Sequence, residues 1–161
     1  MFRRSTWSVR DALVALVAMI GVNALGAVPA VLFGAETEWI DQPWFYPPEI
    51  LFPLVWTALF TLMGLSLFLV WKRASSNRDV WIAFLVFALQ FALNLAWTPV
   101  FFGLQRPDLG LLVIGLLWLA IVGTIIVFSR IDRLAALLLV PYLGWVSFAA
   151  VLNYAIYLHT M

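Results

Sequence analysis

Five long apolar stretches separated by short charged segments make up most of this 161-residue chain. They contain no Asp, Glu, Lys or Arg, and they cover residues 12–35, 50–71, 80–105, 109–129 and 134–161. A helix needs about 20 apolar residues to cross the hydrocarbon core of a bilayer, and every stretch reaches that length. The pattern therefore predicts five transmembrane helices, at about 10–33, 48–71, 79–103, 107–129 and 133–158.

Helices rather than strands are expected because backbone polar groups in lipid must be satisfied within the protein. A transmembrane barrel would need alternating strands of about ten residues, and that alternation is missing. The predicted fold is an all-α membrane protein, a five-transmembrane-helix bundle formed by one domain over residues 1–161. Although Arg3, Arg4 and Arg10 precede the first stretch, it is longer than the roughly 7–15 apolar residues of a signal peptide. We expect it to be retained as a helix.

Basic residues are distributed unevenly between the two sides of the predicted membrane. One side carries the N-terminus and the second and fourth links, with Arg3, Arg4, Arg10, Lys72, Arg73, Arg78, Arg130 and Arg133. The other side carries Arg106 alone. Cytoplasmic segments are rich in Lys and Arg, so we expect a cytoplasmic N-terminus and a C-terminus outside.

Composition excludes several classes of function. The chain is 65% hydrophobic and 11% charged, against about 25% charged residues in soluble domains. It has no cysteine and a single histidine, His159, which excludes thiolate and multi-histidine metal sites, so no metal is predicted. A net charge of +1 gives no reason to expect a nucleic-acid partner.

The link over residues 34–47 is the longest and lies on the non-cytoplasmic side. It contains three acids and four aromatic residues: Glu36, Glu38, Asp41, Trp39, Trp44, Phe45 and Tyr46. Such residues form an aromatic belt at the membrane interface, or they form a lid over a pocket that opens on this side. Spacing alone favours the belt and leaves the lid as an alternative.

Prolines mark the start of the second predicted helix. Pro47 and Pro48 fit a first helical turn, where a missing N–H costs no hydrogen bond. Glu49 would then complement the helix dipole. Pro53 lies one turn further on, where it predicts a kink if the released carbonyl finds another partner.

Polar and indole side chains gather in the non-cytoplasmic half of the predicted bundle. They are Asn23, Trp56, Gln90, Asn94, Trp97, Trp145 and Asn153. Amides between membrane helices serve as hydrogen-bonding glue, worth about 0.6 kcal/mol per pair. Aromatics combined with a few polar groups also form ligand pockets. The residues alone leave these two interpretations about equal, and clustering on one side tilts the choice toward a pocket.

Helical spacing places several of these residues on shared faces. Gln90, Asn94, Trp97 and Phe101 follow a 4-3-4 spacing, which forms one stripe of a helix. A second stripe contains Tyr142, Trp145, Ala149, Leu152 and Asn153, and a third contains Trp56, Phe60 and Met63. A packed bundle shows the same spacing, so these stripes do not decide between glue and pocket.

The predicted spans contain no carboxylate pair, Lys or catalytic His, and this argues against acid–base chemistry. Ion-coupled transporters carry ionisable residues within the membrane, and channels need a polar lumen or filter. Neither feature is visible in the sequence. Binding of a flat, largely apolar ligand remains, and tryptophan could donate an electron to an excited aromatic ligand there.

Several motifs in order identify a family resemblance. The chain contains PWFYPP at 43–48, PLVWT at 53–57, ALNLAWTPVFFG at 92–103, PYLGWVSFA at 141–149 and LNY at 152–154. Over roughly residues 12–158, this pattern closely resembles the TspO/MBR family of tryptophan-rich sensory and translocator proteins. The resemblance implies a five-helix bundle that commonly forms homodimers.

The resemblance also implies a ligand, because family members bind porphyrins such as protoporphyrin IX and haem, as ligand or substrate. Some bacterial members promote light-dependent porphyrin breakdown, in which two tryptophans matching Trp56 and Trp145 take part. Asn94, Trp97 and Ala149 match pocket residues of the family. The resulting set of candidate ligand-binding residues is Trp44, Pro47, Trp56, Phe60, Asn94, Trp97, Phe101, Trp145, Ala149 and Asn153.

The chain departs from the family pattern at a few positions. No Lys or Arg follows Tyr154, so the basic end of the family's cholesterol motif is missing, although lipids or sterols stay alternative ligands. Phe60 stands where a pocket tyrosine is common, and Leu109 stands where a tryptophan is common. The resemblance thus implies a porphyrin-binding protein with a regulatory role, and we expect it in a prokaryotic cell membrane. The alternative is a transporter of porphyrin-like or lipid-like molecules.

Overall fold

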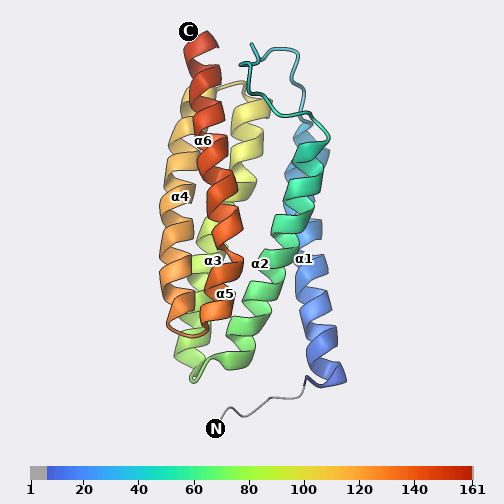
Figure 1. Ribbon diagram of the computed structural model, residues 1–161, viewed down its shortest axis with the longest axis vertical. Helices are drawn as coiled ribbons and strands as arrows, with labels where there is room; N and C mark the ends of the chain where they lie inside the picture. The colour runs from blue at the N-terminus through green and yellow to red at the C-terminus, as the bar shows by residue number, and fades with distance from the viewer. Residues whose placement is uncertain (1–6, 161) are drawn as a thin grey trace.

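A computed structural model describes residues 7–160, and their regular structure is helical throughout (Figure 1). The elements are α1 (Val9–Phe33), α2 (Leu51–Arg73), α3 (Asn77–Thr98), the π-helix η1 (Pro99–Gly103), α4 (Pro107–Ser129), α5 (Arg133–Leu138) and α6 (Val140–Thr160). Among the described residues, five spans are long and apolar enough to cross a membrane: Val9–Phe33, Leu51–Arg73, Asn77–Gly103, Pro107–Ser129 and Arg133–His159. The predicted all-helical fold with five membrane-spanning segments is confirmed.

Side-chain caps fix the starts of three helices at one end of the bundle. Ser8 accepts from the backbone N–H of Asp11 while the Asp11 carboxylate accepts from Ser8, which is a capping box that starts α1. Ser76 caps α3 and Asp132 caps α5 in the same way, by accepting N–H groups of their first turns. These bonds satisfy donors that a helix start would otherwise leave unpaired.

The second helix begins later than the sequence suggests. It starts at Leu51 rather than 48, and Pro48 and Glu49 form a preceding turn whose carbonyls accept from Leu51 and Phe52. Pro53 is consequently the third helical residue. An N–H group in the first turn has no carbonyl acceptor within the helix, so the N–H that Pro53 lacks removes no hydrogen bond. The proline therefore gives no reason for a kink at this position.

Prolines interrupt two other spans. The third span changes at Pro99 from α3 to η1, where the N–H of Leu104 donates to the carbonyl of Pro99 at 2.9 Å. The fifth span is divided at Leu139, two residues before Pro141, into α5 and α6. Proline cannot donate to the carbonyl four residues earlier, which explains why the regular ladder breaks near both positions.

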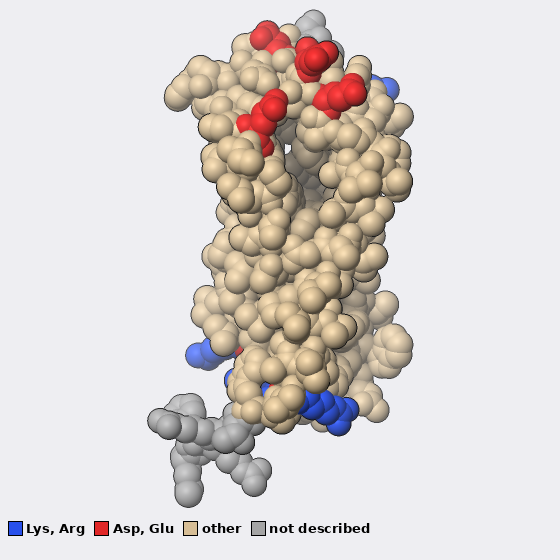
Figure 2. All heavy atoms as spheres, turned by 90° about the vertical axis from the view of Figure 1, so that its right-hand side faces the viewer, with Lys and Arg blue, Asp and Glu red and all other residues tan. Residues whose placement is uncertain are grey.

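Charged side chains lie at the two ends of the molecule (Figure 2). We call the end with Glu36, Glu38, Asp41 and Glu49 the acidic end. The opposite, basic end holds Arg10, Lys72, Arg73, Arg78, Arg130 and Arg133, while Arg3 and Arg4 lie outside the described residues. The start of α1 and the end of α6 also lie at opposite ends (Figure 1).

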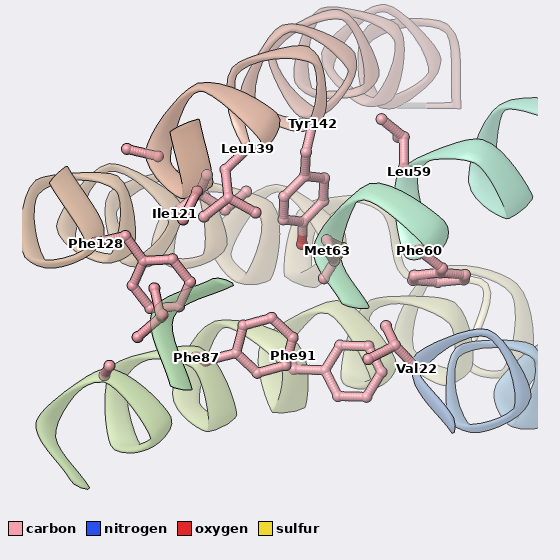
Figure 3. Close-up of a cluster of buried hydrophobic side chains, with 14 of the residues drawn as sticks. Val22, Leu59, Phe60, Met63, Phe87, Phe91, Ile121, Phe128, Leu139 and Tyr142 are labelled. Carbon is pink, nitrogen blue, oxygen red and sulfur yellow. The ribbon is translucent and has the colours of Figure 1, made fainter. Parts of the chain in front are cut away.

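The half of the bundle toward the basic end contains a dense hydrophobic core. Phe128, Val70 and Ala83 are fully buried there, and the Phe128 ring stacks on Phe87 with centroids 6.4 Å apart (Figure 3). Ion pairs border this core: Lys72 to Asp11 at 2.9 Å, and Arg73 to the buried Asp132 at 2.7 Å. Packing and charge together hold α1, α2 and α5 in this half.

Candidate ligand-binding cavity

A cavity of about 1020 Å³ occupies the half of the bundle toward the acidic end. Its wall is formed by α1, α2, α3 and α6, with Phe102 of η1, Ile114 and Leu117 of α4 and a few residues of the 34–50 link. Figure 2 views the side formed by α1 and α2, where a hollow is visible beneath the acidic side chains. The cavity is at the upper end of the volume range typical of small-molecule and cofactor sites.

Six of the candidate residues line this cavity: Trp56, Phe60, Asn94, Trp97, Trp145 and Ala149. They come from α2, α3 and α6, which are far apart in the chain. The three predicted stripes therefore meet around one space. The wall has an apolar and aromatic character, interrupted by a few amides and hydroxyls.

Four candidate residues lie outside the cavity wall. Phe101 is 2% exposed and packs with Ile40, Leu152 and Ile156 in a separate cluster. Asn153 is 1% exposed and lies behind Trp97. Trp44 is 96% exposed and Pro47 is absent from the wall, because the link places both away from the space between the helices.

A buried hydrogen-bond chain orients Asn94. Its amide N–H donates to the Tyr142 hydroxyl at 3.0 Å, and that hydroxyl donates to the side-chain oxygen of Gln90 at 3.0 Å. Tyr142 and Gln90 are each 1% exposed, so the chain lies behind the wall, and the Nε2 of Gln90 has no partner among residues 7–160. Because these polar groups are buried, leaving any of them unpaired would be costly. The hydrogen bonds therefore hold the Asn94 side chain in one orientation at the cavity surface.

Trp97 is held by a second set of polar contacts. Its indole N–H donates to the Asn153 side-chain oxygen at 3.2 Å, and Asn153 donates to the carbonyl of Pro107 at 2.9 Å. The Trp97 ring stacks on Phe101 with centroids 4.7 Å apart. Trp97 thus contributes a ring to the wall while its polar atom is already occupied.

The other two wall tryptophans keep their polar atoms available. Trp56 packs on Phe60 with centroids 5.2 Å apart and meets Tyr142 edge-on at 6.2 Å. Trp145 meets Phe52 edge-on at 5.9 Å. Within residues 7–160, neither indole N–H donates a hydrogen bond to another residue.

Sequence reasoning missed most of the contribution of α1 and one face of α2. Small residues of α1 line the cavity: Ala24, Gly26, Ala27 and Ala30. Asn23 donates to the carbonyl of Met19 and to the Thr61 hydroxyl, and Thr61 and Thr57 donate to carbonyls one turn back. The run of small residues in α1 was the available signal, since small side chains leave space next to a bulky neighbour such as Phe60.

The 34–50 link covers the acidic end of the cavity. Ala35, Thr37 and Tyr46 belong to the wall, and the Thr37 hydroxyl donates to the Glu49 carboxylate at 2.8 Å. Burial, with the nearby Glu49 carboxylate, raises the pKa of Tyr46. Trp39 instead packs against Phe101, 5.4 Å between centroids. The link has the position expected of a lid, and closure over a ligand stays a prediction.

A smaller hollow of about 440 Å³ adjoins the cavity and shares Ala35, Thr37 and Glu49 with it. Glu36 and Glu38 complete its wall. We call Glu36, Glu38 and Glu49 the acidic rim. No group of three His, Cys, Asp or Glu side chains suited to a metal ion occurs among the described residues.

Five apolar spans around an aromatic cavity define the class of this molecule: it is an integral, multi-pass membrane protein. Residues 12–158 match the model of the TspO/MBR family, and the chain belongs to that family. It is 48% identical over 115 residues to a tryptophan-rich protein TspO of Chlorobaculum tepidum, covering 71% of this chain and 73% of that protein.

Two further relatives show the breadth of the family. A tryptophan-rich sensory protein of Cereibacter sphaeroides is 40% identical over 120 residues, 73% of each chain. The human translocator protein is 34% identical over 119 residues, covering 73% of this chain and 70% of the human protein. Similarity thus extends from bacterial to animal members.

Proposed function

We propose that this protein binds porphyrins, such as protoporphyrin IX and haem, in the cavity and has a sensory or regulatory role. The observation that supports this most is a large aromatic cavity whose wall includes Trp56, Trp145 and Asn94. Flat ring faces would provide contact area for a flat ligand, and Asn94 would provide orientation. The name of the Cereibacter relative, a sensory protein, agrees with the proposed role.

The proposed setting is the cell membrane of a prokaryote, with the basic end in the cytoplasm and the protein present as a homodimer. Basic segments are retained on the cytoplasmic side during insertion, and the basic end carries Lys72, Arg73 and Arg78 together with Arg130 and Arg133. The cavity would then lie toward the outer side.

A titration with protoporphyrin IX, followed by quenching of tryptophan fluorescence, tests binding. We expect saturable quenching, with affinity reduced about tenfold in Asn94→Ala because one hydrogen bond to the ligand is lost. Trp145→Phe should also weaken binding. Trp81→Phe is the matched control, since Trp81 is 69% exposed and absent from the cavity wall. The absence of saturable quenching, or equal affinity in all variants, would reject this cavity as the porphyrin site.

A light-dependent step is a further part of the proposal. Trp56 and Trp145 are the wall tryptophans assigned to this step: either would donate one electron to a photoexcited porphyrin and become a radical, and the reduced porphyrin would pass that electron to oxygen. Illumination of the complex in air should change its absorbance, and Trp56→Phe should slow that change. Spectra that stay constant under light and oxygen would leave binding as the whole activity.

The alternative function is transport of porphyrin-like or lipid-like molecules. It is favoured by the name translocator protein of several relatives and by a cavity that reaches the surface beside α1 and α2. Transport predicts flux of porphyrin across vesicles that contain the protein. Binding without flux would exclude it.

A further inference from the structure

A buried amide with an unpaired N–H group ends the hydrogen-bond chain behind the cavity wall. Gln90 is 1% exposed, and its side-chain oxygen accepts from Tyr142, but its Nε2 has no hydrogen-bond partner among residues 7–160. Buried N–H groups are rarely left unpaired in proteins, because they lose their bonds to water and gain none in return. The unpaired donor of Gln90 therefore needs an explanation.

The three side chains of this chain can form their hydrogen bonds in either direction. A tyrosine hydroxyl both donates and accepts, and a side-chain amide carries an acceptor and a donor at nearly equivalent positions. In the direction described above, Asn94 donates to Tyr142, and Tyr142 donates to Gln90. In the reverse direction, Gln90 would donate to Tyr142, and Tyr142 would donate to the Oδ1 of Asn94. Each direction contains two hydrogen bonds and leaves one atom of Gln90 unpaired, so the two are similar in free energy.

The direction of the chain decides which atom Asn94 presents to the cavity. Asn94 belongs to the wall, and Tyr142 engages its Nδ2 while no other described residue bonds its Oδ1. With Nδ2 toward Tyr142, the Oδ1 remains for a ligand and can only accept. In the reverse direction, Nδ2 remains and donates. Trp97, Thr57 and Thr61 lack this choice, because they already donate to protein oxygens.

We propose that Tyr142 and Gln90 are positioning residues that allow Asn94 to present either an acceptor or a donor to a flat ligand. The ligand selects the direction: an N–H group on the ligand favours the direction described, and a carbonyl group favours the reverse. The inference rests on the proposed use of the cavity for flat aromatic ligands, and it adds which polar groups such a ligand can carry. A free-base porphyrin has N–H donors at its centre, haem has none there, and both have carboxyl oxygens at the edge. A reversible chain suits both.

The test uses three planar tricyclic compounds of nearly equal shape. Fluorenone offers only an acceptor, carbazole offers only an N–H donor, and fluorene offers neither. Each compound is titrated calorimetrically into the full-length protein in detergent micelles, and the heat of entry into empty micelles is subtracted. Affinities are expressed relative to fluorene, which removes the contribution of apolar contact. For the wild type, we expect fluorenone and carbazole each to bind about threefold to tenfold more tightly than fluorene, because each gains one hydrogen bond.

The variant Gln90→Leu should fix the chain in one direction. Without the Gln90 oxygen, the Tyr142 hydroxyl keeps only the Asn94 Oδ1 as an acceptor within the chain, so Nδ2 is left for the ligand. We expect carbazole to lose its advantage over fluorene, a fall of about threefold to tenfold, while fluorenone keeps its advantage. A merely structural role of Gln90 would change all three affinities together. If Gln90→Leu does not fold, Gln90→Met replaces it with an unbranched side chain of similar length.

Two further variants provide the controls. Asn94→Ala should abolish the advantages of both fluorenone and carbazole, because it removes the group that faces the ligand. Ser66→Ala removes another fully buried side-chain hydrogen bond, to the carbonyl of Ala135 in the half toward the basic end. Both advantages should remain in that variant, because Ser66 belongs to neither the chain nor the cavity wall.

The outcomes separate this proposal from porphyrin binding. A wild type that prefers only one of fluorenone and carbazole over fluorene would overturn the reversible chain, as would a Gln90 variant that keeps the carbazole advantage or loses both advantages equally. None of these results changes the titration with protoporphyrin IX. Absence of saturable binding by all three compounds would overturn the proposal as well. If porphyrin fails to quench while the tricyclic compounds behave as expected, the porphyrin site is rejected and the reversible chain stands.

Discussion

In the basic half of the bundle α1 and α2 meet backbone to backbone, whereas in the acidic half the same two helices line a cavity. A Cβ added at Gly64 would lie 2.5 Å from the Cα of Met19, so only glycine allows that approach. Toward the acidic end, Asn23 and Ala27 of α1 and Trp56 of α2 form part of the cavity wall. One pair of helices thus combines a close backbone contact with an open site, and the two adjoin at Met19, which also belongs to the cavity wall.

The largest expected difference between the halves comes from removing an aromatic ring. Phe128→Ala should lower the free energy of unfolding by about 3–5 kcal/mol, because the fully buried ring leaves a void among packed neighbours. Phe102→Ala removes the same atoms from the cavity wall, where the ring already borders empty space, and should cost less than half as much. Denaturant unfolding in mixed micelles measures both. Equal losses would show that the two halves are packed alike.

A smaller effect is expected from adding one methyl group at the helix contact. Gly64→Ala should destabilise the protein by about 1–3 kcal/mol, since the new methyl group would press on the backbone of α1. Gly115→Ala is the control, because no atom lies within 4 Å of its added Cβ and alanine favours helix by up to about 1 kcal/mol. Thermal unfolding of the two variants compares them. A harmless Gly64→Ala would mean that α1 is not fixed at this point.

The smallest effect on stability is expected at Trp97, a cavity-wall residue that is hydrogen-bonded to Asn153 behind the wall. Trp97→Phe keeps an aromatic ring at the cavity but removes the donor to Asn153, leaving a buried oxygen without that partner. We expect a loss of about 1 kcal/mol in the free energy of unfolding. Porphyrin affinity should change less than in Trp145→Phe, whose indole N–H is available to a ligand. A larger loss of affinity in Trp97→Phe than in Trp145→Phe would reverse these assignments.

The sequence predicted the spans well because each is a long apolar run, and a run of that kind has one stable form in lipid. Helix ends near proline were less predictable. Pro48 and Pro53 both suit a first helical turn. Only the structure shows that α2 begins with the turn that contains Pro53. The π-turn at Pro99 and the break at Leu139 lie near prolines, but a proline alone does not predict a break, since Pro29 lies inside the continuous helix α1.

Helical spacing identified the faces of α2, α3 and α6 that are directed toward the cavity. It did not show which residues on each face reach the cavity and which are buried behind its wall. Asn94 and Trp97 reach the cavity while Phe101, on the same expected stripe, is buried against the link residue Trp39. Spacing assumes a regular helix, and η1 ends that regularity at Pro99. Asn23 of α1 was recognised from the sequence, but its small wall residues were missed for a different reason: alanine and glycine carry no chemistry that marks them individually.

The π-turn has a consequence for the length of the chain. Its hydrogen bond from Leu104 to Pro99 closes over five residues, one more than a turn of α-helix requires. Because the wide turn accommodates one extra residue, loss of a single residue between 100 and 102 would allow an ordinary α-turn while α4 keeps its place, including the Pro107 carbonyl that accepts from Asn153. We therefore expect relatives that lack one residue here to keep the same fold with a regular helical turn at this point. The π-turn thus lets the length of this segment vary by one residue without moving α4.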